Sequence, residues 1–151
     1  MGLKLSTKGR YGLIAMLDLA SYYLGGPVAL KSIAERQKIS ESYLEQLFAS
    51  LRKSGLVKSI RGAQGGYLIA NEPGGITIGS ILRALEGSMA PVDCVAEGDT
   101  VRCERENECI TRFVWKRIRD GINEVVDSVT LENLVEECAN YKQHGSYMYY
   151  I

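Results

Sequence analysis

The segment from residue 40 to residue 55 reads SESYLEQLFASLRKSG, and its pattern is the strongest indication of the fold class. Its apolar residues recur at helical spacing and define one buried face: Leu44, Leu47, Phe48 and Leu51. Ser40 or Ser42 is the expected N-cap, and Ser42 with Glu45 has the form of a capping box. Gly55 follows the end of the helix. The opposite face is polar, as a helix that enters the major groove of DNA must be.

The flanking segments complete a winged helix-turn-helix pattern. Upstream, apolar spacing predicts a long helix over residues 7–24 and a short helix over residues 31–37. Downstream, residues 56–60 and 67–70 read as short strands, joined by a glycine-rich tip. A further helix runs from about Thr77 and stops at Gly87. We therefore expect a mainly α-helical fold with a small β-hairpin wing.

The rest of the chain divides at its cysteines. Residues 88–109 have no helical period and carry three of the four cysteines. In residues 110–151, the spacing of the apolar residues predicts a long helix and then a last helix, which Thr130 caps. The expected organisation is a DNA-binding domain over residues 1–87, a cysteine-bearing loop over 88–109, and a dimerisation helix with a C-terminal helix and tail over 110–151.

Composition excludes several classes of protein. The chain has 151 residues, of which 46% are hydrophobic and 24% are charged, and this balance is typical of an ordered globular protein. No stretch approaches the length of a membrane helix, and no signal peptide is recognisable, so we expect a cytoplasmic protein without membrane contact. A single histidine makes a Ser–His–Asp triad hard to build, and we expect no enzyme activity.

The neutral total charge conceals two charged halves. Residues 1–70 hold ten basic and four acidic side chains, a net charge of +6, and the remaining residues carry −6. A basic half joined to an acidic half is typical of a polyanion-binding domain with an attached control or assembly domain. Such asymmetry also occurs without functional meaning.

Several residues are candidate contacts to double-stranded DNA. On the helix the candidates for base contacts are Ser40, Ser42, Tyr43 and Gln46. On the wing, Arg61 stands beside glycines, Gly65 among them, that let the backbone approach a groove or phosphates. The expected phosphate contacts are Lys31, Arg52, Lys53 and Lys58. A winged helix that binds RNA or protein is the alternative.

Three cysteines form a candidate metal site in the pattern C-x8-C-x5-C: Cys94, Cys103 and Cys109. The pattern lacks the C-x2-C pairs of structural zinc sites, and its wide spacing suits an iron–sulfur cluster. Unligated thiols or a thiol redox switch are the alternatives. A fourth ligand would have to come from Cys138, His144, Glu106, Glu108 or a second subunit.

Four motifs resemble the IscR group of bacterial winged-helix regulators, which includes NsrR and CymR. They are LSTKGRYG at residues 5–12, SYLEQL at 42–47, LRKSGLV at 51–57 and RGxxGGYL at 61–68. The resemblance implies a homodimer, joined through the long helix that follows the cysteine loop, on imperfectly palindromic promoter DNA. It also implies that Glu45 tunes which operators are accepted, and that the three loop cysteines bind a 2Fe–2S cluster.

The ligand set of the family is incomplete here. IscR has a histidine three residues after its last cysteine ligand, and this chain has Arg112 at that position. NsrR uses an acidic residue of the first helix of the partner subunit, and the matching residue here is Arg10. The fourth ligand of a cluster is therefore not identified by the resemblance.

The last residues, SYMYYI at 146–151, resemble the tail of CymR. This likeness implies control by a cysteine synthase, which would capture the carboxylate of Ile151 in its active site. CymR lacks the cysteine loop, however, and an aromatic tail also suits packing on a partner subunit. The sequence thus favours a regulator that senses iron–sulfur cluster status, with a repressor of cysteine metabolism as the alternative.

Overall fold

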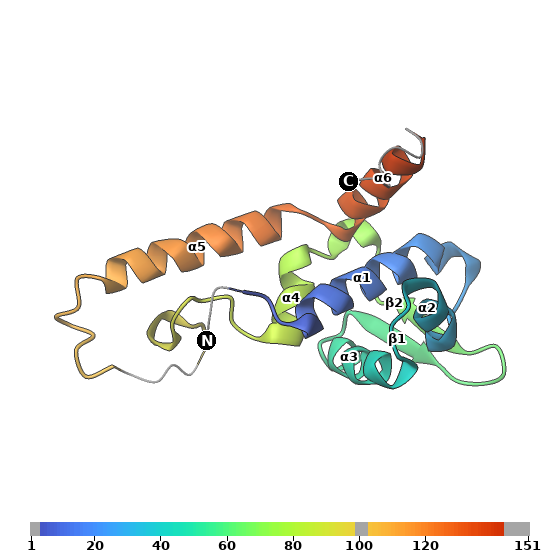
Figure 1. Cartoon of the computed structure of the whole chain (residues 1–151), viewed down its shortest axis with the longest axis horizontal. Helices are drawn as coiled ribbons and strands as arrows, with labels where there is room; N and C mark the ends of the chain where they lie inside the picture. Colours follow the sequence, from blue (N-terminus) through green and yellow to red (C-terminus); the bar gives the residue numbers. More distant parts are fainter. Residues whose placement is uncertain (1–3, 99–102, 144–151) are drawn as a thin grey trace.

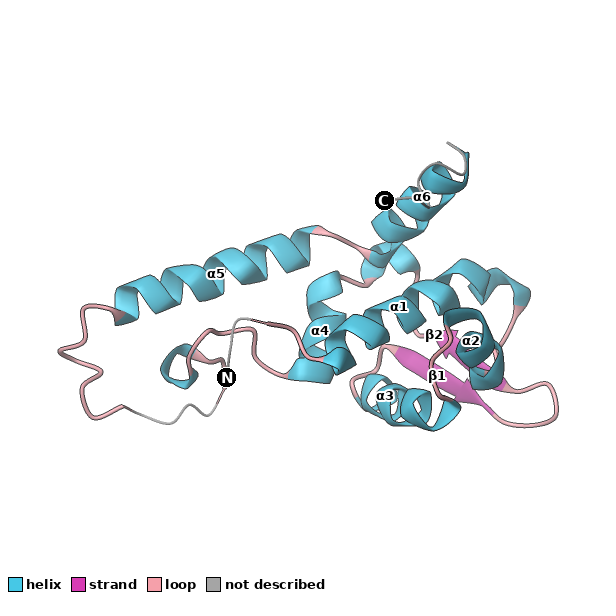
Figure 2. Cartoon of the chain, in the orientation of Figure 1, coloured by secondary structure: helices cyan, strands magenta, loops and turns pink. Residues whose placement is uncertain are grey.

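The computed structural model describes residues 4–98 and 103–143. Within them the chain forms six α-helices, three short 3-10 turns and one antiparallel β-hairpin (Figures 1 and 2). The helices are α1 (Thr7–Tyr22), α2 (Leu30–Gln37), α3 (Glu41–Lys53), α4 (Ile78–Glu86), α5 (Arg112–Ser128) and α6 (Leu131–Gln143). The strands are β1 (Val57–Ile60) and β2 (Gly66–Ile69), and the turns are η1 (Tyr23–Gly25), η2 (Pro73–Gly75) and η3 (Asp93–Val95). The expected mainly helical fold with a hairpin wing is confirmed.

The core lies around α1. This helix packs against α2, α3, α4 and α6, and its inward residues Met16 and Leu19 are fully buried. From α3, the predicted apolar face is buried in the same core, with Phe48 at its centre. The Phe48 ring meets the Tyr67 ring of β2 edge-on, with 4.9 Å between the ring centroids. The core therefore fixes the wing relative to α3.

Short polar residues set where the helices begin. Ser6 accepts a hydrogen bond from the Lys8 amide at the start of α1, and Thr77 accepts one from the Ser80 amide at the start of α4. Ser40 caps α3 by accepting from the amide of Tyr43, at 3.2 Å. Of the two expected caps, Ser40 is therefore the one used. The capping box of Ser42 and Glu45 does not form, because Ser42 already lies within the first turn.

A buried ion pair fixes α2 on α1. The Asp18 carboxylate is 5% exposed and accepts hydrogen bonds from the guanidinium of Arg36, at 2.7 and 2.9 Å. Gln37 donates a third hydrogen bond to the same carboxylate, at 2.9 Å. Because α2 leads directly into the turn before α3, this pair also fixes where the helix-turn-helix begins.

The hairpin gains a third partner that the sequence did not indicate. Val28 forms a β-bridge with Tyr67, and the two residues exchange backbone hydrogen bonds of 2.8 and 2.9 Å. A single bridge directly after Pro27 has no alternating pattern that could predict it. It holds the segment between α1 and α2 against the base of the wing.

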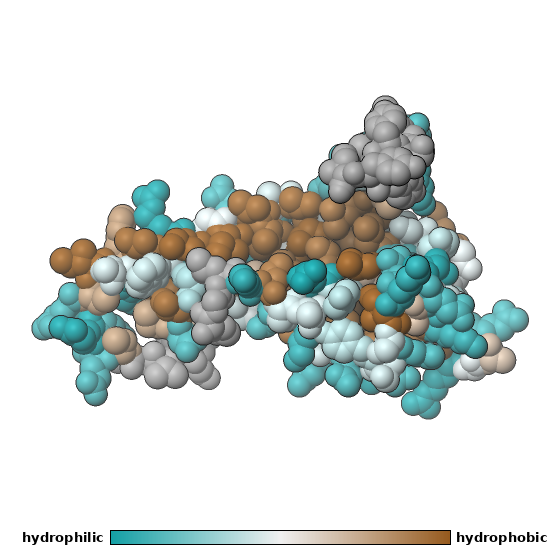
Figure 3. All heavy atoms as spheres, viewed as in Figure 1, coloured by the Kyte–Doolittle hydropathy of each residue, from teal (hydrophilic) through white to brown (hydrophobic). Residues whose placement is uncertain are grey.

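Helix α5 projects from the body formed by α1–α4 (Figure 1). None of its residues is buried, although most of its apolar side chains, Val114 and Val125 among them, follow one stripe. Three large members of this helix are more than 40% exposed: Phe113, Val114 and Val125. Figure 3 shows the apolar side chains gathered along this part of the molecule. Among the described residues, no helix is long and apolar enough to span a bilayer.

Candidate nucleic-acid interface

The outer face of α3 is free to contact a ligand. Ser40, Ser42, Glu45 and Gln46 are exposed, while the opposite face is buried against α1 and α4. Because Ser40 uses its oxygen to cap the helix, its hydroxyl proton is still free to be donated to a phosphate. The side chains of Ser42 and Gln46 are four residues apart and lie on one surface of the helix. This arrangement fits insertion of α3 into a major groove.

Tyr43 differs from the other α3 candidates because it is half-buried. Its hydroxyl lies 3.1 Å from the hydroxyl of Thr7, and its ring stands edge-on to that of Tyr11. Tyr43 therefore ties the start of α3 to the first turns of α1. The predicted base contact by Tyr43 would have to be made by the exposed part of its ring or by its hydroxyl.

The wing presents Arg61 at its tip. The strands pair in the register Val57↔Ile69 to Ile60↔Gly66, so residues 61–65 form the turn. The amide of Gly65 donates to the carbonyl oxygen of Gly62 at 3.0 Å, which closes the turn. A methyl group on Gly65 would overlap the carbonyl oxygen of Ile60, so this position requires glycine. Arg61 is exposed beside this tight turn.

The predicted phosphate contacts are all exposed: Lys31, Arg52, Lys53 and Lys58. Arg52 also donates to the hydroxyl of Ser59 at 3.4 Å, which links the end of α3 to β1. Lys53 ends α3 and Lys58 lies on β1, so these charges border the two candidate reading elements. A basic border of this kind attracts the phosphate backbone without selecting a sequence.

The cysteine loop lies away from this surface, beside α5. Cys94 is half-buried in η3, Cys103 is exposed and Cys109 is half-buried just before α5. Within residues 4–98 and 103–143, no three histidine, cysteine or acidic side chains come close enough together to hold a metal ion. The structure therefore does not bring the three predicted ligands together. Of the candidate fourth ligands, Cys138 lies half-buried on α6, and His144 is outside the described residues.

One thiol in the loop has the chemistry of a ligand. Cys109 Sγ lies 3.1 Å from the hydroxyl of Thr111, and this hydrogen bond, with the Arg112 amide, lowers the pKa of the thiol. A lower pKa favours the thiolate, which is the form that binds iron. The chemistry of Cys109 thus suits a ligand of an iron–sulfur cluster.

Comparison with known proteins gives the family. A model of the Rrf2 family, described as an iron-dependent transcriptional regulator, matches residues 5–137. The chain belongs to the Rrf2 family. It is therefore a helix-turn-helix transcriptional regulator rather than an enzyme, as the sequence motifs indicated.

Two kinds of Rrf2 regulator are similar to most or nearly all of the chain. The regulator CymR of Bacillus subtilis is 48% identical over 151 residues, which cover 99% of this chain and 100% of CymR. The regulator IscR of Citrobacter koseri is 42% identical over 133 residues, which cover 88% of this chain and 80% of IscR.

Solved structures of both kinds share the fold. The structure of CymR, described as the global cysteine regulator of B. subtilis, is 51% identical with a TM-score of 0.72, and the match covers 89% of this chain and 97% of CymR. The structure of T. potens IscR is 49% identical with a TM-score of 0.76, and the match covers 99% of this chain and 98% of IscR.

One polar cluster, which joins α4, α5 and the cysteine loop, was not identified from the sequence. Its members are Arg83, Asp127, Asn123 and Glu97. Arg83 and Asp127 are 44 residues apart, so no local pattern pairs them. The spacing of Asn123 and Asp127 was a usable signal, because two polar residues four apart share one helix face.

Proposed function

We propose that this protein is a homodimeric regulator that binds promoter DNA through α3 and the wing and controls genes of cysteine metabolism. The identity to CymR carries this proposal. It is 48% for the CymR of B. subtilis against 42% for the IscR of C. koseri, and 51% against 49% for the solved structures of CymR and T. potens IscR. The protein would act in the cytoplasm, where promoter DNA is accessible. The first candidate is thus the regulator of cysteine metabolism, which the sequence offered as the alternative to a sensor of iron–sulfur clusters.

The residues of α3 and of the wing would have different roles in binding DNA. Gln46 can hydrogen-bond an adenine edge in the major groove, and Ser42 can hydrogen-bond either a base or a phosphate. Glu45 can accept from a cytosine amino group and repels nearby phosphates, which suits a residue that sets operator choice. Arg61 would enter a narrow minor groove beside the recognition helix. The flanking lysines would add affinity that falls steeply with salt.

A dimer would form through the exposed stripe of α5. Val114 is 45% exposed and Val125 is 65% exposed on this stripe, and burial of such side chains against a second copy removes them from water. Two α3 helices related by a two-fold axis would then meet the two halves of a palindrome. Val125→Asp is expected to yield monomers in sedimentation, whereas Glu124→Ala on the polar flank is expected to leave the dimer intact.

Control by a cysteine synthase rests on residues 146–151, which lie outside the described residues. Titration with purified cysteine synthase is expected to change the affinity of the protein for its operator. Ile151→Asp is expected to abolish that response while leaving DNA binding by the free protein unchanged. An equal response from the variant and the original chain would refute the proposed partner site.

Selection of DNA fragments from the host genome tests which genes the protein regulates. Fragments retained by the purified protein are sequenced, and the proposal predicts promoters of genes for cysteine uptake and synthesis. Retention of promoters for iron–sulfur cluster assembly alone would contradict the first candidate and favour the second. Glu45→Ala provides a comparison, because the operator set should shift if Glu45 sets operator choice.

The second candidate is a regulator that senses iron–sulfur cluster status, and the three loop cysteines favour it. Cys94, Cys103 and Cys109 would hold a 2Fe–2S cluster, which supplies a group whose presence depends on iron, sulfide and oxidants. Thiolate formation at Cys109 is already favoured by Thr111. The fourth ligand is not assigned.

Anaerobic purification tests this second candidate. It predicts a coloured protein with two iron and two sulfide ions for each chain, and loss of both in Cys109→Ser. Cys138→Ser is the matched control, because this half-buried cysteine lies on α6 away from the loop. A colourless, iron-free protein would refute cluster sensing and leave the cysteine-metabolism proposal standing.

A further inference from the structure

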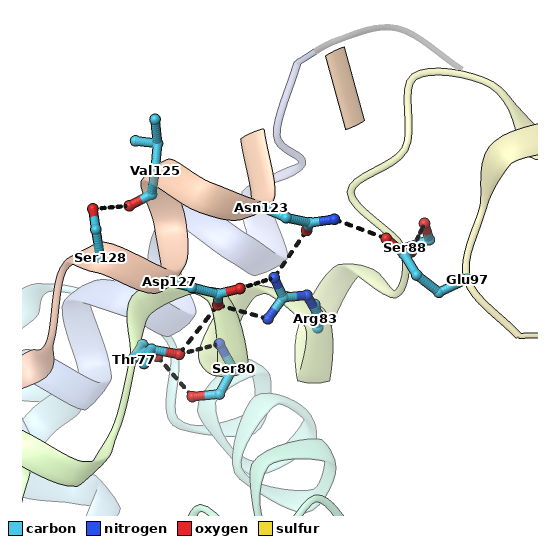
Figure 4. Close-up of polar contacts among 9 residues, drawn as sticks. All are labelled: Thr77, Ser80, Arg83, Ser88, Glu97, Asn123, Val125, Asp127 and Ser128. Atoms are coloured by element: carbon cyan, nitrogen blue, oxygen red, sulfur yellow. Dashed lines mark hydrogen bonds and ion pairs between the residues drawn. The ribbon is translucent and has the colours of Figure 1, made fainter. Parts of the chain in front are cut away.

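Arg83 of α4 joins the body of the molecule to α5. Its guanidinium donates to both carboxylate oxygens of Asp127, at 2.9 and 2.8 Å, and to the amide oxygen of Asn123, at 2.8 Å (Figure 4). Asn123 and Asp127 lie one turn apart on α5, so a single guanidinium holds two successive turns of that helix. A planar guanidinium held at three points fixes the direction as well as the distance of its partners.

The backbone reinforces this junction at its base. Ile78 donates its amide to Val129 at 2.9 Å, and Leu131 donates to Ile76 at 2.8 Å. Gly79 lies directly beneath Asp127, and a methyl group there would overlap the carboxylate. The C-terminal end of α5 is thus held rigidly on α4. With this end held, α5 can still tilt relative to α4, and the hydrogen bonds from Arg83 restrain that tilt.

The cysteine loop is attached to the same place. The amide nitrogen of Asn123 donates to Glu97 at 2.8 Å, and the hydroxyl of Ser88 donates to the other carboxylate oxygen of Glu97. One helix turn before Asn123, Arg119 donates to the carbonyl oxygen of Val95 at 3.0 Å. Val95 is 2% exposed and follows Cys94 directly. Residues 88–98 are therefore fastened to α5 at two points.

Asn123 is the residue shared by both attachments. One side of its carboxamide accepts from Arg83, and the other side donates to Glu97. Because the carboxamide is planar, its oxygen and nitrogen turn together about one bond. A displacement of Glu97 removes the acceptor of the nitrogen, so the carboxamide can turn about that bond and shift its oxygen relative to Arg83.

We propose that Asn123 is a positioning residue that transmits the state of the cysteine loop to the angle between α5 and α4. This inference rests on the proposed function, because α5 joins the two protomers and α4 belongs to the body that carries α3. A change in tilt at this junction changes the separation of the two α3 helices. Operator spacing, rather than recognition of single bases, is then the property that the loop controls.

The spacing preference of three variants tests the inference. Asn123→Asp keeps the acceptor for Arg83 and replaces the donor to Glu97 with a repelling carboxylate. Glu97→Gln weakens the same contact without changing α5, and Glu124→Ala is the matched control on the exposed flank. The probes are the duplex that the original chain selects from a random library and the same duplex with one base pair inserted between its half-sites.

The ratio of the two affinities is the decisive readout. Asn123→Asp is expected to lower the ratio of the affinity for the selected duplex to that for the lengthened duplex about tenfold. This change corresponds to the loss of one charge-assisted hydrogen bond. We expect a smaller decrease for Glu97→Gln and none for Glu124→Ala. A purely structural role would weaken both duplexes equally. A ratio within twofold of the original chain in both variants would therefore overturn the inference.

Hydrogen exchange separates this inference from the proposed function. In the free protein, Asn123→Asp is expected to speed exchange of amides in residues 88–98 and in the second half of α4. If the original chain selects no duplex, DNA recognition fails as a proposal, and the exchange measurement alone decides the coupling. Faster exchange confined to the loop would overturn the coupling, whatever the outcome with DNA.

Discussion

Removal of the arginine that pairs with Asp18 tests how the helix-turn-helix is held. In Arg36→Met, the carboxylate of Asp18 keeps Gln37 but loses both guanidinium hydrogen bonds. The side chain of Asp18 is 2% exposed and that of Arg36 is 34% exposed. Breaking a fully buried ion pair destabilises a protein by about 3–5 kcal/mol. Since water reaches Arg36, we expect a loss of about 2–3 kcal/mol in the free energy of unfolding.

Urea unfolding followed by circular dichroism measures this loss. Lys31→Met on the same helix is the control, because Lys31 is exposed, and we expect a change within about 0.5 kcal/mol. The double variant Asp18→Leu/Arg36→Met removes the buried charge as well. It should be more stable than Arg36→Met alone, since no unpaired carboxylate remains. A loss below about 0.5 kcal/mol in Arg36→Met would contradict a stabilising role for the Asp18–Arg36 pair.

Three further predictions concern the wing, the α4–α5 junction and the core. Gly65→Ala forces the wing tip open and should weaken DNA binding about 5- to 100-fold in fluorescence anisotropy; unchanged affinity would contradict the wing contact. Hydrogen bonds from Arg83 lower the pKa of Asp127 in the folded chain, so protonation favours unfolding. The stability from this junction should be present at neutral pH and lost as the pH falls below the ordinary value of 3.8; melting curves of Asp127→Asn should lack that part of the decrease. Phe48→Ala empties a fully buried site and should cost about 3–5 kcal/mol in urea unfolding, and a loss below about 1 kcal/mol would contradict the packing.

Local patterns were sufficient to predict most of the fold. The spacing of Leu44, Leu47 and Leu51 gave both the existence and the buried face of α3, because one side of that helix carries its apolar residues. Gly87 marked the end of α4 for an equally local reason, since its φ of 84° lies in a region that glycine favours. The choice between Ser40 and Ser42 as N-cap could not be predicted from local sequence, because it depends on where the turn after α2 ends and α3 begins.

Contacts between distant residues could not be predicted in the same way. The bridge between Val28 and Tyr67 and the pairing of Arg83 with Asp127 depend on how whole helices pack. The exposed candidates on α3 could be named from the sequence, because a helix with one apolar face leaves the other face to solvent. Whether three cysteines converge depends on the path of a loop without periodicity, and sequence spacing does not determine that path.

The salt dependence of DNA binding measures whether α3 and the wing form a DNA-binding surface. Fluorescence anisotropy with a selected duplex is measured from low to high salt for the original chain and for Arg61→Ala. Five exposed cations in each protomer border α3 and the wing. If all ten cations of a dimer contact phosphates, the slope of log K against log salt reaches about −9, and the slope for Arg61→Ala is less steep by about two. A slope near zero, with equal binding by the chain and Arg61→Ala, would contradict a DNA-binding surface built from α3 and the wing.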